Sequence, residues 1–144
     1  MARRLSGLLA AALAAAHVME AIAMMTPEEY RKAREDAEFH LQLEVKKMTP
    51  PERTPGLCAV EGTVARVFRG KLAPGTPMKL VVSCKRRDER ARPGGEHWIF
   101  TEDLAGARFL EAYVNREAQG YAIAAWQSAI IAAPSDRPQF SGKD

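Results

Sequence analysis

Two short segments that alternate apolar and polar residues, each with one cysteine, most strongly constrain how this chain can fold. Leu57–Phe68 and Met78–Lys85 show the period of two that is typical of half-buried strands. The link between them contains Gly70, Pro74 and Gly75, which favour turns. We therefore predict that the two segments form an antiparallel hairpin.

One register of this hairpin pairs the cysteines and also assembles an apolar face, with Cys58 opposite Cys84. The apolar pairs formed by the same register are Val60 with Val82 and Val64 with Met78. Opposed cysteines can bring their Cβ atoms to the separation of about 4 Å that a disulfide needs. We predict a Cys58–Cys84 disulfide if the chain folds in an oxidising compartment, and two buried thiols in the cytosol.

The segments before and within the hairpin predict a helix, a strand and a bulge. Thr26–Glu29 combines a capping residue, a proline and a capping-box glutamate, so a short helix is expected at about 26–37. Phe39–Lys46 alternates like a strand, although its composition also suits a helix. The pattern shifts in the first hairpin segment and predicts a β-bulge near Ala65–Arg66.

The C-terminal half is expected to add further short strands. They are His97–Thr101, Phe109–Asn115 and Tyr121–Ile131, with a turn or helical turn over Glu102–Ala107. A helix over residues 104–114 is the alternative there. Five or six short strands with frequent turns predict a mostly β fold, namely a small five- or six-stranded OB-like barrel with a short N-terminal helix.

Residues 1–23 have the three parts of a secretory signal peptide in the usual order. A positively charged start precedes Leu5–Ala16, an uncharged apolar run, and a small-x-small pattern at Ala21–Ala23. Cleavage is expected after Ala23, with a cut after Ala16 as the alternative. The apolar run is too short to span a bilayer of about 30 Å. The mature protein is therefore expected to be periplasmic or secreted, without a membrane span.

The composition fits one globular domain behind this leader. The chain has 144 residues, of which 47% are hydrophobic and 27% charged, and this balance argues against disorder. Its net charge of +3 is too small to predict nucleic-acid binding. We expect a signal peptide over 1–23, a barrel domain over 24–132 and a flexible tail over 133–144.

No catalytic, cofactor or metal site is predicted. His40 and His97 are the histidines beyond the leader, and neither has a cysteine or carboxylate at metal-ligand spacing. His40 is expected on the polar side of its strand. Ser83 and Ser128 lack the motif of an activated nucleophile. The aromatic residues, Trp126 among them, are expected mainly in the barrel core.

The highly charged stretch after the hairpin is the candidate ligand surface. The cations there are Lys85, Arg86, Arg87, Arg90 and Arg92, and Trp98 is a neighbouring candidate for stacking on a ligand. Asp88 and Glu89 interrupt the positive charge. A solvated loop is therefore the favoured interpretation, over a loop that binds an anion or nucleic acid.

The hairpin resembles the start of netrin-like modules, which are small OB-type barrels of secreted proteins that include tissue inhibitors of metalloproteinases. The motif is Cys58-x-Val60-x-Gly62-x-Val64 followed by Val67-Phe68, Gly70, Leu72 and Pro74-Gly75. The likeness covers about residues 57–101, and small exported bacterial proteins of unassigned function are also similar. The inhibitors chelate the target's metal through an N-terminal cysteine. Here the cleaved chain would begin near Met24 without one, so protease inhibition is not implied.

These observations favour an exported, non-enzymatic envelope or secreted protein that binds a protein or glycan partner through an OB-like barrel. One alternative is an enzyme whose site is not visible in the sequence. The other is an anion or nucleic-acid binder that uses the Arg86–Arg92 loop.

Overall fold

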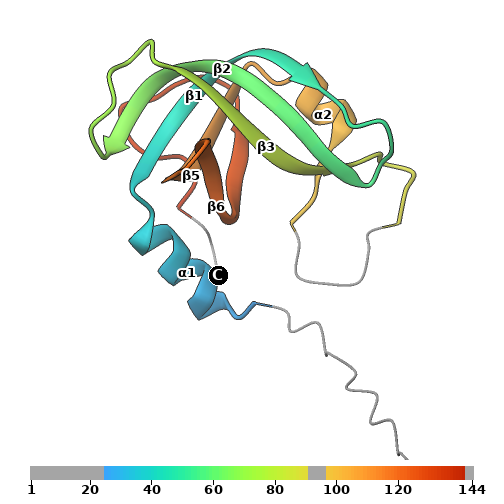
Figure 1. Cartoon of the computed structure of the whole chain (residues 1–144), viewed down its shortest axis with the longest axis horizontal. Coiled ribbons are helices and arrows are strands. Elements are labelled where there is room, and N and C mark those ends of the chain that lie inside the picture. Colours follow the sequence, from blue (N-terminus) through green and yellow to red (C-terminus); the bar gives the residue numbers. More distant parts are fainter. Residues whose placement is uncertain (1–24, 91–96, 142–144) are drawn as a thin grey trace, which may run out of the picture.

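The computed structural model describes residues 25–90 and 97–141 (Figure 1). The predicted signal peptide lies outside the described residues. The elements are α1 (Pro27–Asp36), β1 (Phe39–Thr49), β2 (Gly56–Arg69), β3 (Pro77–Lys85), β4 (Ile99–Phe100), α2 (Thr101–Ala105), β5 (Phe109–Glu117) and β6 (Gly120–Ile131). The mostly β fold with a short N-terminal helix is confirmed. Residues 104–114 divide between α2 and β5, which settles the open alternative.

A single six-stranded sheet has the order β4-β3-β2-β1-β5-β6 and curls on itself (Figure 1). The two-residue β4 pairs in parallel with the end of β3, while the five longer strands form an antiparallel ladder. The curl brings β3 close to β6 without making them hydrogen-bonded neighbours. The result is the small, partly open barrel expected of an OB-like fold.

The inside of the curl is filled by the apolar face of each long strand. Its fully buried members include Leu41, Leu43, Val60, Leu80, Leu110 and Val114. Gly62 is required where β2 crosses β1, because a Cβ there would overlap the carbonyl oxygen of Glu44. This close approach gives a physical reason for the central glycine of the β2 motif.

The predicted hairpin and disulfide are both present, but the register differs by two residues. Cys58 and Cys84 are joined, with their Cα atoms 5.8 Å apart. In the ladder, however, Cys58 pairs with Val82, and Cys84 pairs with Gly56. A shift of two leaves every side chain on its predicted face because the strand period is two. The disulfide therefore links diagonal neighbours instead of directly opposed residues.

The predicted bulge in β2 is confirmed at Ala65. Gln42 of β1 pairs with Arg66, and the next residue, Leu43, pairs with Val64. Ala65 is thus the extra residue that has no partner in this ladder. The bulge bends β2 around the barrel, as an inserted residue does in an antiparallel pair.

Helix α1 is fixed at both ends by side chains. At its start Thr26 and Glu29 form the predicted capping box. At its end the Arg69 guanidinium donates to the carbonyl oxygens of Arg34 and Ala37, at 2.6 and 3.0 Å. A cation on the last carbonyls of a helix stabilises it. The helix packs against β6, at the open end of the barrel (Figure 1).

Candidate functional site

The space between β3 and β6 contains a pocket of about 260 Å³, which we call the seam pocket. It lies where the barrel is not closed by hydrogen bonds. Its walls include Leu57, Val81 and Ser83 from β2 and β3, and Ile123, Trp126 and Ser128 from β6. Most of this lining is apolar, and no carboxylate contributes to it.

The seam pocket opens beside unusually exposed aliphatic side chains. Leu57 is 57% exposed and Val81 is 46% exposed, whereas most large apolar residues of the described chain are buried. The third such residue, Ile130, lies outside the pocket. Large apolar groups that remain in water next to a concavity are typical of binding surfaces.

Ser83 supplies a polar group to this apolar wall. It is the ladder partner of Leu57, so both side chains stand on the same face of the sheet. The residue is only 4% exposed, so its hydroxyl lies at the inner part of the pocket wall and not on the open surface.

A bulge in β6 shapes the opposite wall. Val114 of β5 pairs with Ile123, and Ala112 pairs with Ser128, so Tyr113 alone spans four residues of β6. Within the bulge Ala125 and Trp126 have φ angles of 43° and 57°. This left-handed conformation costs a non-glycine residue about 1–2 kcal/mol. Strain of this kind persists only where the surroundings enforce it.

Gln127 and Arg34 enforce the bulge. The Gln127 amide nitrogen donates to the carbonyl oxygen of Ala125 at 3.1 Å, and its amide oxygen accepts from Arg34 at 2.8 Å. Both side chains are buried, and Arg34 belongs to α1. The N-terminal helix therefore holds the strand segment that carries Trp126 at the pocket.

Replacing Ala125 with Gly is expected to raise the free energy of unfolding by about 1 kcal/mol, because glycine tolerates the left-handed region. Equilibrium urea unfolding measures this. Ala129→Gly is the matched control in the extended part of β6 and should lower the stability by about 0.5–1 kcal/mol. Equal losses in both variants would contradict the strained conformation.

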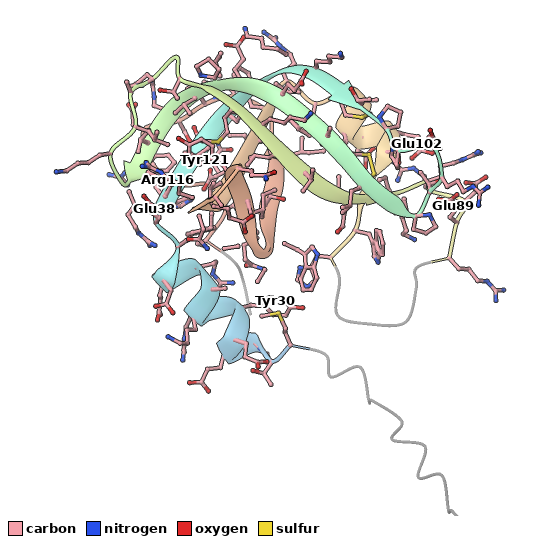
Figure 2. All side chains as sticks on the ribbon, in the orientation of Figure 1. Tyr30, Glu38, Glu89, Glu102, Arg116 and Tyr121 are labelled. Atoms are coloured by element: carbon pink, nitrogen blue, oxygen red, sulfur yellow. A yellow bond between two sulfur atoms is a disulfide. The ribbon has the colours of Figure 1, made fainter. Side chains whose placement is uncertain are left out.

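The tryptophan at the seam pocket is Trp126, whereas the stacking candidate named from the sequence was Trp98. Trp98 is half-buried and is not part of the pocket lining. Its neighbour His97 does line the pocket, and the centroid of the His97 ring lies 4.7 Å from that of Tyr30. Figure 2 shows Tyr30 on α1. The sequence around Trp126 does not distinguish it from an aromatic residue of the core. The β6 bulge that contains Trp126 has no glycine, so the sequence gives no sign of a bulge there.

The charged loop after β3 is folded around its own ion pairs. Arg87 bonds Asp103 at 2.6 Å and its guanidinium lies 4.4 Å from the Phe100 ring centroid. Glu89 accepts from Thr54 and from the backbone N–H of Arg86. Of the other cations of the predicted ligand surface, Lys85 donates to the carbonyl oxygen of Glu89 and Arg90 is exposed. Arg92 lies outside the described residues. Glu89 and Glu102 lie at the same end of the molecule (Figure 2).

His40 lies on the polar face of β1, as expected, but this face is buried in a polar cluster. It is 5% exposed, and its Nε2 is 2.8 Å from the carboxylate of the fully buried Glu111. Its ring stacks on Tyr113 at 3.9 Å. Gln42 donates to the other Glu111 oxygen at 2.8 Å. The alternation of β1 was identified correctly, but its polar face is covered.

The segment that covers the polar face of β1 is residues 135–140, which belong to the tail expected to be flexible over 133–144. The backbone N–H groups of Gln139 and Phe140 each donate to the Glu111 carboxylate at 3.0 Å. Ser135 donates its N–H to the Gln42 amide oxygen at 2.9 Å. Polar groups of β1 and β5 therefore attach residues 135–140 to the outside of the barrel. Few apolar residues are involved, which explains why composition predicted a loose end.

The cluster also shifts the ionisation of its members. Burial is the main cause that lowers the pKa of His40 below its ordinary value of 6.5, and the positive charge of Arg69 also lowers this pKa. The hydrogen bond and negative charge of Glu111 raise the pKa of His40, but they do not outweigh burial. Burial raises the pKa of Glu111, but hydrogen bonds from Gln42, Gln139 and Phe140 outweigh it and bring the pKa below 4.5. Both groups therefore resist protonation in the folded state.

Acid should accordingly destabilise the fold in two steps. The unfolded chain takes up a proton at His40 below about pH 6.5 and at Glu111 below about pH 4.5, before the folded state does, so the free energy of unfolding falls with pH. Urea unfolding between pH 7.5 and 4 measures this. His40→Gln should flatten the upper step, while Glu117→Gln, at an exposed site on β5, should leave both unchanged. A wild-type profile flat from pH 7.5 to 5 would contradict the shift at His40.

In the described ranges, no three His, Cys, Asp or Glu side chains converge closely enough to hold a metal ion. Residues 25–90 and 97–141 also contain no helix that is long and apolar enough to cross a membrane. We take the seam pocket as the candidate site because the exposed Leu57 and Val81 lie at its apolar walls. Comparison of the chain with protein-family models, curated proteins and solved structures finds no match.

Proposed function

We propose that the chain is an exported, non-catalytic binding domain that docks a protein partner at the seam pocket. The observation that carries this proposal is the apolar pocket between β3 and β6 with the exposed Leu57 and Val81 beside it. Its lining has no carboxylate or cysteine, and its polar side chains are those of Ser83, His97 and Ser128. Mostly aliphatic walls suit the side chains of a protein better than the hydroxyls of a glycan.

Export is supported by two independent features. The leader over residues 1–23 has the order of charge, apolar run and cleavage pattern of a signal peptide. The Cys58–Cys84 disulfide is of a kind that persists in the periplasm or outside the cell. The OB-like barrel also agrees with the netrin-like resemblance, which remains a proposal about ancestry. N-terminal sequencing of the native protein should find Met24 first, and an intact residue 1 or 2 would overturn export.

Site-specific photocrosslinking in the cells that make the protein tests the docking surface. A photoreactive phenylalanine analogue at Leu57 should give a discrete adduct with another protein. The same analogue at Lys47, an exposed residue of β1, is the matched control and should give none. Adducts of equal yield at both positions, or at neither, would contradict the seam pocket as the partner site.

A further inference from the structure

We infer that α1 clamps the seam pocket, so that the pocket keeps its shape only while α1 is docked on the barrel. The fold then has two states, one with α1 docked and the pocket formed, and one with α1 undocked and the pocket altered. This inference concerns the pocket itself and does not depend on which partner occupies it.

Two side chains on one face of α1 contact the two sides of the seam pocket. Tyr30 and Arg34 are four residues apart, so they lie on the same face of the helix. Tyr30 contacts the ring of His97, a pocket residue that precedes β4, the strand paired with β3. Arg34 donates to Gln127 of β6 at 2.8 Å. The helix therefore connects the two sides of the pocket, where β3 and β6 are not hydrogen-bonded neighbours.

The bulge in β6 gives the pocket wall a second possible arrangement. Ala125 and Trp126 line the pocket, and their φ angles are 43° and 57°. The Gln127 amide holds the bulge by donating to the carbonyl oxygen of Ala125, and Arg34 holds this amide in turn. When Arg34 withdraws, the amide loses its donor, and the two strained residues can return to the extended conformation of a strand. The Trp126 indole then leaves its place in the pocket wall.

Little apolar surface holds α1 on the barrel. The helix has ten residues, and isolated helices of this length are marginal in water. Arg34 is the one buried residue among those ten. Docking thus depends on a few contacts, namely those of Arg34, of Tyr30, and of Arg69 with the last carbonyl oxygens. Elements with few buried apolar contacts open locally at a lower free energy than core strands. Each undocking of α1 removes both contacts with the pocket.

Hydrogen exchange of the oxidised full chain tests the coupling, with Ala125→Gly as the decisive variant. Glycine relieves strain that only the docked state contains, so the amides of α1 should exchange about fivefold more slowly. Ala129→Gly, in the extended part of β6, should leave exchange in α1 unchanged. In the wild-type chain the α1 amides should exchange at least about tenfold faster than those of β1.

Two results of the exchange experiment would overturn the inference. If the α1 amides exchange equally in the wild type and in Ala125→Gly, docking of the helix and the bulge are independent. If α1 and β1 exchange at the same rate in the wild type, the helix opens only when the barrel unfolds. Neither result involves the partner, so the inference can fail while the Leu57 photoadduct and the proposed function stand.

Fluorescence of Trp126 tests the coupling in the opposite direction, in a Trp98→Phe background. Arg34→Gln should increase quenching by acrylamide about twofold, because coupling between two sites is reciprocal. Lys32→Gln is the matched control, since it removes an exposed ion pair of α1 with Asp36, and it should leave quenching unchanged. Unchanged quenching in a folded Arg34→Gln chain would overturn the clamp. If Arg34→Gln fails to fold, exchange in Ala125→Gly still decides, because that variant is expected to stabilise the chain.

Discussion

Replacing Glu111 with Ala is expected to lower the free energy of unfolding by about 3–5 kcal/mol, because four donors lose their shared acceptor. The carboxylate is fully buried and accepts hydrogen bonds from two side chains and two backbone N–H groups. The His40 and Gln42 side chains would lose this acceptor at buried positions, where water cannot easily replace it. For a small domain with a stability of roughly 5–15 kcal/mol, the loss would approach unfolding at ordinary temperatures. Urea unfolding at pH 7.5 measures it.

Two further measurements test the physical cause of that loss. Glu117→Ala, at an exposed position on the same strand, should change the stability by less than about 0.5 kcal/mol. Hydrogen exchange at the amides of Gln139 and Phe140 should accelerate in Glu111→Ala, because both amides donate to the missing carboxylate. Unchanged protection of these amides would show that Glu111 does not attach the C-terminal segment.

Removal of the disulfide should have the second largest effect. Cys58→Ala combined with Cys84→Ala should reduce the free energy of unfolding by about 3 kcal/mol in the chain-entropy model. The bridge closes a loop across a sequence separation of 26 residues, and both cysteines are fully buried. The corresponding fall in melting temperature would be about 10 °C. Thermal unfolding followed by circular dichroism measures it.

Reduction of the wild-type chain is the matched control, because it opens the bridge without changing core volume. A reductant should lower the wild-type melting temperature toward that of the double alanine variant and leave the variant unaffected. If the oxidised chain and the variant melt together, the bridge does not restrict the unfolded chain. Free thiols in protein isolated from its native compartment would instead count against export.

The two predictions concern opposite faces of the sheet. The disulfide joins β2 to β3 inside the barrel, whereas Glu111 fastens the C-terminal segment to its outside. Arg69 and Arg34 add a third attachment by tying α1 to β2 and to the β6 bulge. We assign the partner site to the seam pocket instead, because its walls are mostly apolar and the exposed Leu57 and Val81 lie beside it.

Features that depend on neighbours along the chain could be predicted from the order of residues. The capping box at Thr26, the strand period of Leu57–Phe68, the bulge at Ala65 and the inward faces of the two cysteines were all predictable. Each of these features is set by local backbone geometry. Side chains on one face recur every two residues in a strand and every 3.6 residues in a helix, so the order of apolar and polar residues shows the pattern. The hairpin register was wrong by two residues because a shift of two keeps all faces unchanged.

The remaining features depend on contacts between residues that are far apart in the chain. His40 and Glu111 are 71 residues apart, and a polar side chain on a strand gives no indication of whether another segment will cover it. The seam pocket likewise depends on how far the sheet curls before β3 meets β6, and on a bulge held by Arg34 from a separate helix. The curvature of the sheet and the covering of the polar face of β1 both result from contacts between residues far apart in the chain. A single sequence does not show which distant residues will pair.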